Sequence, residues 1–319
     1  MSTIKDVAKA ASCSISTVSY ALNNDKRIPE VTANRIKGIA QEIGYFPSGA
    51  ARNLKKKNTS RVLVAISDFG GPVYHELLDG IHNQLSKNGY TMIVSTGSSS
   101  DTLLKERSAD GAIITDIHIT NETLIQLAKN FRPIIVLDRS LVDESIFNMT
   151  IDNHHAMVEL TTEVINKGYE KIAFVHGVKD TYDNKTRFSG FLSAMEEHHK
   201  TLFHEYYGNF TKTSGIEIAN ALIASHAQLP DMFVCANDEM AIGIMETMQK
   251  AGYVVPKDFG ISGFDDIELA SYVTPSLSSI KIDHFGWGKA VAKTILKLLK
   301  VEKIEINKQM GKIMIRESF

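Results

Sequence analysis

Polar and aromatic side chains follow several short apolar runs between residues 61 and 319, at the points where buried strands would end. These candidate ligand-binding residues are Asp68, Phe69, Tyr74, Asp138, Arg187, Phe210, Asn237 and Asp265. Carboxylates accept hydrogen bonds from hydroxyl groups, arginine and asparagine donate them, and an aromatic ring packs on the C–H face of a sugar ring. The set therefore suits a neutral, polyhydroxylated ligand.

Hydroxyl groups and positive charge are concentrated in the first sixty residues. One short stretch carries the hydroxyl side chains of Ser12, Ser14, Ser16, Thr17 and Ser19. Residues 1–60 contain ten Lys or Arg against four Asp or Glu, a net charge of +6, so the remainder carries −8 although the whole chain is at −2. A basic segment on an acidic body indicates a polyanionic partner, of which nucleic acid is the commonest.

The sequence carries no motif for catalysis, metal binding or membrane insertion. No Gly-x-Ser-x-Gly motif, phosphate-binding loop or pair of catalytic carboxylates occurs, so we expect neither an enzyme nor a cofactor. The two cysteines, Cys13 and Cys235, belong to no Cys/His cluster, so we expect no metal site. There is no signal peptide and no apolar run of about 18 residues, so we expect a cytoplasmic protein without a membrane partner.

Residues 1–47 have the periodicity of three short helices. Apolar residues at helical spacing predict helices over 4–11, over 16–23, and over a segment that follows Pro29 and ends at Gly44. Ser14 stands at the N-cap position of the second helix. Two helices joined by such a short turn form a helix-turn-helix, whose second helix enters the major groove of DNA. Its outward residues here are Ile15, Ser16 and Tyr20.

From residue 62 onward, short apolar runs alternate with amphipathic helices, which is typical of parallel sheets with helices on both faces. The predicted strands are 62–66, 91–95, 111–115, 134–137, 172–175, 203–207, 232–235 and 260–262. Two such sets in tandem predict two lobes with a ligand between them, beyond the carboxyl ends of the strands. The sequence leaves two assignments open. Asp238 is at least as well explained as a helix cap as it is as a ligand contact. Tyr74 and Phe210 fit a place in the cleft wall and a place in the core equally well.

Several motifs of the chain are specific when they are taken together. They are residues 3–11 (TIKDVAKAA), Ser16-Thr17-Val18-Ser19, Asn23, Gly44-Tyr45-Phe46-Pro47 and Ala51-Arg52-Asn53-Leu54-Lys55. With them the chain resembles the lactose-repressor/galactose-repressor family of bacterial transcription regulators, and the resemblance continues to the C-terminal strand. It implies a homodimer whose two heads read palindromic operator DNA. The DNA-contacting residues that it implies are Thr3, Ser14, Ile15, Ser16, Thr17, Ser19, Tyr20, Asn23, Tyr45, Ala51, Leu54 and Lys55.

The resemblance also implies a fold: a small all-α helix-turn-helix head and an α/β two-lobed core like a periplasmic binding protein, with parallel sheets and helices on both faces. The predicted domains are a DNA-binding domain (1–47), a hinge helix and linker (48–60) and a core for effector binding and dimerisation (61–319). Within the core, the first lobe takes about 61–150 plus 283–309, and the second about 151–282 plus 310–319.

The hinge has a physical rationale of its own. A segment as short as 48–55 is marginal as an isolated helix in water, so pairing with its twin on DNA would supply the missing contacts. Leu54 would then be an apolar wedge inserted between base pairs from the minor groove, with Ala51 and Lys55 close to the groove floor.

Within the resemblance, Arg187 and Asp265 hold the effector, while Asp138 and Asn237 align with other polar cleft positions. We therefore expect a repressor of a carbohydrate-utilisation operon that is controlled by a small ligand, in the first place a sugar. A purine-type corepressor and a protein corepressor that docks on the core stay open as alternatives. A different class would be an orphan ligand-binding module whose head only oligomerises. Whether the effector releases or promotes DNA binding is left open.

Some residues depart from the family pattern. Ser12 replaces Gly in the turn, Tyr20 replaces Arg, and Ser48 replaces Asn. Because Tyr20 removes a bidentate guanine contact, no operator sequence is predicted. Ser12 would cost on the order of 1 kcal/mol if its φ is positive. The segment 95–110 is shorter than is usual in the family, which predicts a reduced helix over about 101–107 and leaves the dimer geometry open.

Overall fold

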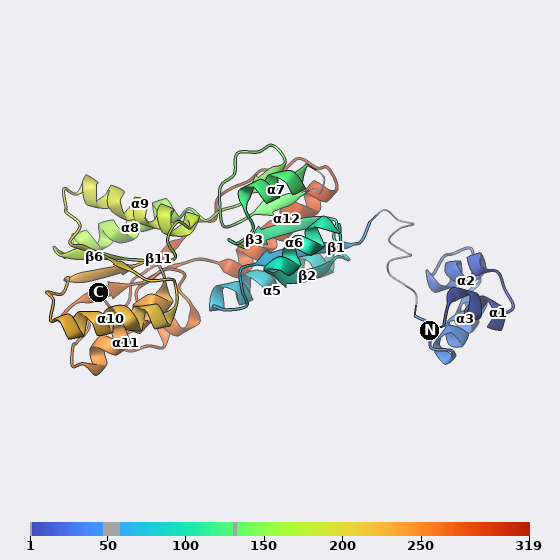
Figure 1. The fold of residues 1–319 in the computed structure, drawn as a ribbon, viewed down its shortest axis with the longest axis horizontal. Coiled ribbons are helices and arrows are strands. Elements are labelled where there is room, and N and C mark those ends of the chain that lie inside the picture. The colour runs from blue at the N-terminus through green and yellow to red at the C-terminus, as the bar shows by residue number, and fades with distance from the viewer. Residues whose placement is uncertain (1, 47–57, 130–132) are drawn as a thin grey trace. The chain divides into compact units, whose positions relative to one another are not determined.

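The structure, a computed structural model, describes residues 2–46, 58–129 and 133–319. It divides into two units, Met1–Thr59 and Ser60–Phe319, whose elements are labelled in Figure 1. The predicted hinge residues Ala51, Leu54 and Lys55 lie outside the described residues, and so does Ser48.

The N-terminal unit consists of α1 (Ile4–Ala10), α2 (Ile15–Leu22) and α3 (Glu30–Glu42). These helices pack around a small core that includes the fully buried Val7, Val18 and Ile36. Ser14 is the N-cap of α2, as predicted, because its Oγ accepts a hydrogen bond from the Thr17 amide at 3.1 Å. The cap and the shared core place α1 and α2 as a helix-turn-helix.

The turn between α1 and α2 contains the residue at which backbone strain was expected. Ser12 has a φ of +51°, in the left-handed region that glycine adopts at lower cost. The corresponding position after α3 is occupied by Gly44, with a φ of +66°. The turn of the head thus holds a serine in a conformation that its side chain disfavours by about 1 kcal/mol.

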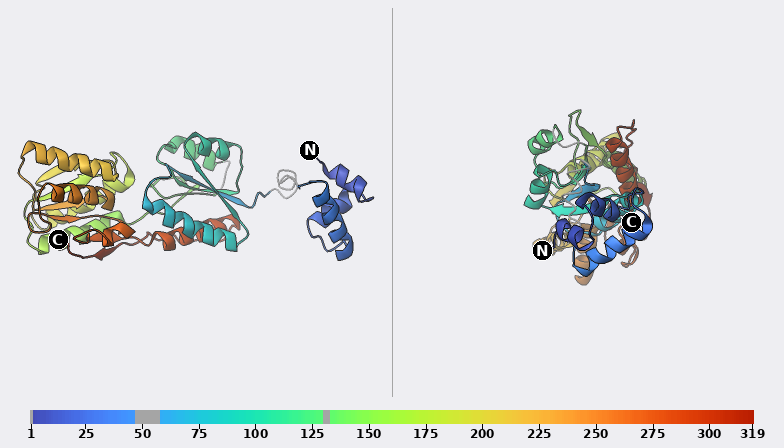
Figure 2. Two further views of the ribbon diagram at one scale, coloured as in Figure 1. Left: turned by 90° about the horizontal axis from the view of Figure 1, so that it is seen from below. Right: turned by 90° about the vertical axis from the view of Figure 1, so that its right-hand side faces the viewer.

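The first lobe contains a five-stranded parallel sheet with the strand order β2-β1-β3-β4-β5. Its strands are β1 (Arg61–Ile66), β2 (Thr91–Thr96), β3 (Gly111–Thr115), β4 (Ile134–Val136) and β5 (Ile146–Asn148). Its helices are α5 (Pro72–Lys87), α6 (Ser98–Lys105), α7 (Asn121–Ala128) and α12 (His284–Leu299). Val62 and Val64 of β1 pack in the same cluster as α5 and α12, whereas Leu63 packs with α6 and α7. Figure 2 shows these two helix pairs on opposite faces of the sheet.

The second lobe contains a four-stranded parallel sheet with the order β7-β6-β8-β9. Its strands are β6 (Ile172–His176), β7 (His204–Tyr207), β8 (Met232–Cys235) and β9 (Gly260–Ser262). Its helices are α8 (Asn153–Asn166), α9 (Tyr182–Glu197), α10 (Lys212–Ser225) and α11 (Asp238–Lys250). Helix α8 packs on α9 and α10 packs on α11, and the two pairs cover opposite faces of the sheet (Figure 1).

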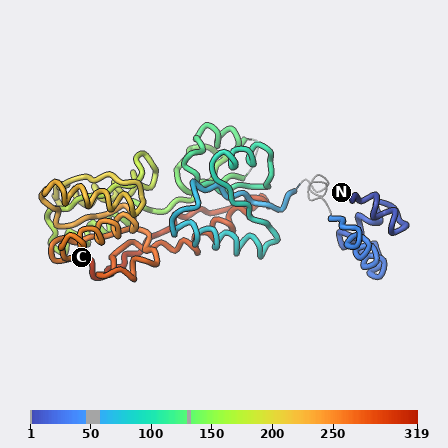
Figure 3. Tube along the Cα trace, turned by 60° about the horizontal axis from the view of Figure 1, so that its bottom comes forward, coloured from blue at the N-terminus to red at the C-terminus, as the bar shows by residue number. Residues whose placement is uncertain are grey.

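The chain passes between the lobes after β5, before α12 and after α12 (Figure 3). The 3₁₀ turn Glu268–Ser271 leads to β10 (Ser279–Lys281), which pairs antiparallel with β11 (Lys312–Met314). Helix α12 packs along α5 of the first lobe. The segments after β5 and after α12 run side by side, since Ile151 forms a β-bridge with Gln309. A helix-turn-helix head and two parallel α/β lobes confirm the predicted fold class.

Short elements account for the differences from the prediction. The strands β5 and β10 were not predicted, because their three residues mix polar and apolar types and form no apolar run. Helix α6 begins at Ser98, directly after Gly97 with a φ of +56°, rather than at the predicted residue 101. Its Leu104 is buried against the sheet, so this short helix still covers part of one face.

Glycines mark the closest approach of α5 and α12. A Cβ atom on Gly80 would overlap the carbonyl oxygen of Phe285, and one on Gly288 would overlap that of Leu77. We expect Gly80→Ala to lower the free energy of unfolding by about 3 kcal/mol, because backbone atoms cannot move aside as a side chain can. Urea unfolding of the full chain, followed by circular dichroism, measures this loss.

The control for this substitution is Gly38→Ala. Gly38 lies in α3, and a Cβ atom there would meet nothing within 4 Å. Alanine should therefore stabilise the head by about 0.5–1 kcal/mol, measured as slower hydrogen exchange of the α3 amides. A Gly80→Ala variant as stable as the wild type would contradict the close helix packing.

Candidate functional site

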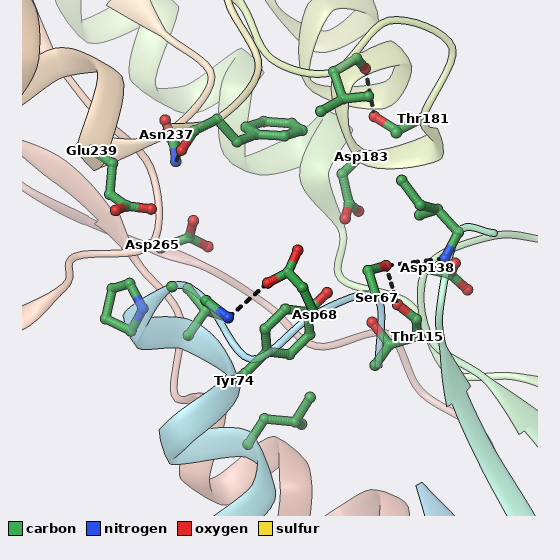
Figure 4. A pocket seen from close by; sticks show the side chains of 18 of the residues that line it. Ser67, Asp68, Tyr74, Thr115, Asp138, Thr181, Asp183, Asn237, Glu239 and Asp265 are labelled. Atoms are coloured by element: carbon green, nitrogen blue, oxygen red, sulfur yellow. Dashed lines mark hydrogen bonds between the residues drawn. The ribbon is translucent and has the colours of Figure 1, made fainter. Parts of the chain in front are cut away.

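A cavity of about 350 Å³ lies between the two lobes (Figure 4). The first lobe contributes the turn after β1, the start of α5 and the ends of β3 and β4. The second lobe contributes α9, the loop after β7 and the residues that follow β8 and β9. The cavity therefore lies at the carboxyl ends of the strands of both sheets, which is where parallel sheets bind ligands, and its size suits a small molecule.

Arg187 is held in place by the second lobe before any ligand arrives. Its side chain is 5% exposed, and its Nη1 donates to the carbonyl of Ala236 at 2.6 Å. Its Nε donates to Oδ1 of Asn153 at 3.0 Å, and the guanidinium lies 3.8 Å from the centre of the Phe264 ring. Because these contacts fix its orientation, a ligand would meet a preorganised donor.

Asp265 is a buried carboxylate between the lobes. It is 8% exposed, and its Oδ1 lies 3.7 Å from Nη2 of Arg187 and 3.3 Å from Nε2 of His284. Burial raises the pKa of the Asp265 carboxyl, but Arg187 and His284 outweigh burial, so the pKa lies below its ordinary value. Asp265 is thus ionised at neutral pH and in contact with both lobes.

The backbone at Asp265 is strained and tied to the strand that crosses between the lobes. Its φ is +100°, which a non-glycine residue adopts only when its surroundings enforce it. The Asp265 amide donates to the carbonyl of Ile280 at 2.8 Å, and the Ile282 amide donates to the carbonyl of Asp265 at 3.4 Å. A ligand that binds Asp265 therefore contacts a residue anchored to the inter-lobe connection.

Asp138 belongs to an ion pair at the end of β4. Arg139 donates to both of its carboxylate oxygens, at 3.0 Å from Nε and 2.6 Å from Nη2, and also to the carbonyls of Asp116 and Ile119. Nearby, burial raises the pKa of the Tyr74 hydroxyl above its ordinary value. Both side chains line the cavity from the first lobe.

Asn237 rather than Asp238 is the N-cap of helix α11. The Asn237 Oδ1 accepts a hydrogen bond from the Met240 amide at 3.2 Å, and its Nδ2 donates to the carbonyl of Phe210 at 2.7 Å. Asp238 is fully buried and accepts hydrogen bonds from Ser279 at 2.5 Å and from the Ile267 amide at 2.8 Å. Burial raises the pKa of Asp238 well above its ordinary value. The helix-cap interpretation of Asp238 is therefore wrong by one residue.

The ring of Phe210 enters the cavity because Gly177 leaves room for it. A Cβ atom on Gly177 would overlap the Phe210 ring, and Phe210 itself has a φ of +69°. The ring centre lies 5.9 Å from the Arg187 guanidinium. A glycine at position 177 and a strained backbone at 210 thus place the aromatic side chain beside the principal donor.

The structure brings most of the predicted ligand-binding residues together. Those that line the cavity are Asp68, Tyr74, Asp138, Arg187, Phe210, Asn237 and Asp265. Phe69 does not line it, since its side chain is 74% exposed on the turn after β1. Lining residues that the sequence did not single out include Ser67, Asp183, Glu239, His284 and Trp287. Ser67 and Glu239 come soon after strands, so the expectation that ligands bind beyond strand ends would have found them. The other three residues lie in helices and carry no such signal.

The predicted DNA-facing side of the head is largely exposed. Ser14, Ser16 and Asn23 are exposed, and Ile15 is 46% exposed, whereas Val18 on the opposite face of α2 is buried. Thr17 and Ser19 are partly buried. Thr3 is the N-cap of α1, where its amide donates to Asp6 at 2.8 Å, and Tyr45 packs against the head core. These positions are consistent with α2 as the reading helix.

Tyr20, which replaces the family's arginine, has an arginine as its neighbour. The Arg27 guanidinium lies 3.9 Å from the centre of the Tyr20 ring, and its Nη2 is 2.6 Å from Oδ2 of Asp25. A guanidinium from the following loop, itself hydrogen-bonded to Asp25, thus lies beside the end of α2.

Over 2–46, 58–129 and 133–319, no helix is both long enough and apolar enough to cross a membrane. In the same residues, no group of three or more His, Cys, Asp or Glu side chains is placed to hold a metal ion.

Comparison with known proteins agrees with both units. Residues 3–48 match the bacterial regulatory proteins of the lacI family, and residues 161–319 match the periplasmic binding protein-like domain. The repressor PurR of Vibrio vulnificus is 31% identical over 311 residues, 94% of this chain and 92% of its own length. The ribose operon repressor of Escherichia coli is 30% identical over 293 residues, 88% of each chain. A crystal structure of the lac repressor dimer bound to operator and the anti-inducer ONPF has a TM-score of 0.86 at 22% identity, covering 99% of this chain and 98% of that one.

The head and the two-lobed core define a DNA-binding regulator with a sensor for a small molecule. The chain belongs to the lacI family of bacterial regulatory proteins. It is a transcriptional repressor with an effector-binding core, and it is not an enzyme.

Proposed function

We propose that this repressor controls a carbohydrate-utilisation operon and that its effector is a sugar bound in the cavity between the lobes. The observation that carries this proposal is the chemistry of the cavity lining, in which carboxylates such as Asp265 and Asp138 outnumber the donors Arg187 and Asn237. Sugar hydroxyl groups donate to carboxylates, whereas a purine presents several ring and carbonyl acceptors that need donors. The lining therefore favours a sugar over a purine.

The DNA-binding half of the proposal follows from the head. One head presents one reading helix, α2, so a homodimer with two heads would read a palindromic operator. We assign direct contact with DNA to the exposed residues of α2 and its N-cap, with Thr3, Asn23 and Tyr45 at the edges of the contact. The hinge residues Ala51, Leu54 and Lys55 would contact the minor groove.

The connection between the two sites runs through Asp265. Its backbone is bonded to Ile280 and Ile282 of the crossing strand, and its carboxylate lies beside His284, the first residue of α12. Helix α12 packs along α5 of the first lobe. A ligand that binds Asp265 would change how the lobes close, and this change would tighten or loosen the paired hinge segments.

A selection from a library of duplexes with randomised half-sites tests the DNA-binding part. At about 0.15 M salt we expect enrichment of a two-fold symmetric sequence, bound at least about 1,000-fold more tightly than its scrambled counterpart. Fluorescence anisotropy with the full-length protein measures both affinities. Recovery of asymmetric sequences only, or equal affinity for both duplexes, would contradict the proposed homodimer on a palindrome.

A further inference from the structure

The cavity lining carries more negative charge than its cations neutralise. Among the described residues, the carboxylates that line it are Asp68, Asp138, Asp183, Glu239 and Asp265, and the only Lys or Arg among them is Arg187. Such an excess disfavours an anionic ligand, for example a uronate or a phosphorylated sugar.

Three of these carboxylates have a compensating interaction. Asp138 is paired with Arg139, and Asp265 lies beside Arg187. Asp183 accepts a hydrogen bond from Asn153 at 2.7 Å, and burial raises the pKa of its carboxyl, which favours the neutral acid.

Asp68 and Glu239 have no such compensation. Within residues 2–46, 58–129 and 133–319, neither side chain forms an ion pair with a Lys, Arg or His. Asp68 accepts a hydrogen bond from the Gly70 amide at 2.7 Å. Asp68 is exposed and Glu239 is partly buried, so solvent rather than a cation of the described residues balances these two carboxylates. A ligand that displaces this solvent has to replace its compensation.

These two carboxylates belong to opposite lobes and approach the same turn. Asp68 lies directly after β1 of the first lobe, and Glu239 lies in the first turn of α11 of the second. A Cβ atom on Gly71 would be 4.0 Å from Oε2 of Glu239, and one on Gly70 would be 3.0 Å from Oδ1 of Asp68. Figure 4 shows both side chains extending into the cavity, with Asp265 between them.

The facing carboxylates repel each other while the cavity holds no cation. Burial, together with the charges of Asp265 and Asp68, raises the pKa of the Glu239 carboxyl above its ordinary value. A positive group placed between Asp68 and Glu239 would remove this repulsion and attract both lobes, whereas a neutral hydroxyl group would remove little of it.

A separate observation concerns a buried donor at the cavity wall. Trp287 is 6% exposed and lines the cavity, and its buried Nε1–H has no hydrogen-bond partner among the described residues. A buried donor without a partner is costly, and a hydroxyl or ring oxygen of a bound ligand would satisfy it. The ligand that fits both observations combines a cation with polar oxygens.

We propose that the effector is a polyhydroxylated amine of the amino-sugar class, whose protonated amino group binds between Asp68 and Glu239. Its ring would lie between Arg187, Asp265 and Trp287. This inference rests on the proposed function, namely that the cavity is the effector site, and it names the charge of the sugar that the cavity selects.

Isothermal titration calorimetry with the full-length protein at pH 7 tests the inference. The probes are glucosamine, galactosamine and mannosamine, each compared with its parent neutral sugar, its N-acetyl derivative and the corresponding uronate. We expect at least one amine to bind at least about tenfold more tightly than its neutral parent, because a charge-assisted contact replaces a neutral one. The N-acetyl derivatives should bind no better than the parent sugars, and the uronates should not bind.

The variant Glu239→Gln isolates the role of the second carboxylate. It should reduce the affinity for the amine at least about tenfold more than the affinity for the parent sugar, so that the preference for the amine is lost. The matched control is Glu246→Gln on the same helix, since Glu246 is paired with Lys212 and does not line the cavity. The control should bind every probe as the wild type does.

The outcomes separate this inference from the proposed function. Neutral sugars that bind as tightly as the amines, or amines that do not bind at all, overturn the amino-sugar assignment alone. A bound amine whose affinity survives Glu239→Gln also overturns it. Binding of any sugar that is undiminished in Asp265→Ala, or a panel in which no compound of any charge binds, counts against the cavity as a sugar site and therefore against both.

Discussion

Replacement of Arg187 by methionine is expected to lower the free energy of unfolding of the core by about 3–5 kcal/mol. The substitution keeps an unbranched apolar stem but removes the guanidinium charge that lies 3.7 Å from the Asp265 carboxylate. It also removes the donor to the carbonyl of Ala236. A buried charge and a buried carbonyl would both lose their partner, and each loss is costly because Asp265 and Ala236 are buried.

The dependence of this loss on pH identifies its cause. In the wild type, the lowered pKa of Asp265 contributes stability above the unfolded value of about 3.9, and this contribution is lost as pH falls through the folded pKa. In the variant, burial raises the pKa of Asp265 without opposition from Arg187, so stability increases as pH falls through that raised pKa. His284 faces Asp265 in the wild type and in the variant alike. The stability gap between wild type and variant should therefore shrink towards acid.

Urea unfolding at pH 5 and pH 7.5 measures this gap. The control is Lys212→Met, which breaks the more exposed pair of Lys212 with Glu246 at 2.9 Å and should cost less than about 1 kcal/mol at either pH. An Arg187→Met variant as stable as the control would show that the Arg187–Asp265 contact is not a buried charge pair. A gap that widens towards acid would show that Asp265 is not the group responsible.

The order of strands and helices was predictable because each element has a local signal. Ser14 caps α2, and Gly44 ends α3, through interactions that involve only neighbouring residues. The central strands of both sheets are buried on both faces, and the clearest of them are apolar runs such as Val62 to Ile66. The two missed strands, β5 (IFN) and β10 (SIK), mix polar and apolar residues and form no apolar run.

The site was predictable to the extent that its residues lie just beyond the carboxyl ends of parallel strands, where such sheets bind ligands. This rule brings together Asp68, Asp138, Asn237 and Asp265, because parallel strands end at the same edge of a sheet. It says nothing about the direction of a side chain within a turn, and for this reason Phe69 lies on the surface although it is adjacent to Asp68.

Helical contributors to the cavity depend on tertiary packing. Asp183 lines the cavity from the first turn of α9, and His284 and Trp287 reach it from α12, far along the chain. Helix α12 arrives there because it crosses back to the first lobe and packs on α5, and Gly80 and Gly288 permit the close approach. No local sequence pattern indicates that a helical residue will reach the cavity in this way.

The hinge prediction carries the other large expected effect. We propose that Leu54 is the wedge of the paired hinge segments on the operator, and we expect Leu54→Ala to weaken specific binding by about 100-fold, or roughly 2–3 kcal/mol. The reason is that alanine cannot hold two base pairs apart, so the kink and the contacts that it permits are lost. Non-specific binding depends on charge alone and should change by less than about threefold.

Fluorescence anisotropy with the selected operator and its scrambled counterpart, over a range of salt concentrations, measures both affinities for Leu54→Ala. The matched control is Lys57→Ala, three residues further along the chain. Loss of this charge should weaken binding to both duplexes about equally and reduce the salt slope by roughly 0.9 if Lys57 contacts one phosphate. Leu54→Ala should instead leave the slope on scrambled DNA unchanged while operator affinity falls. Equal losses on both duplexes would refute the wedge, because a residue that acts only between base pairs of a kinked site has no role on DNA that stays straight.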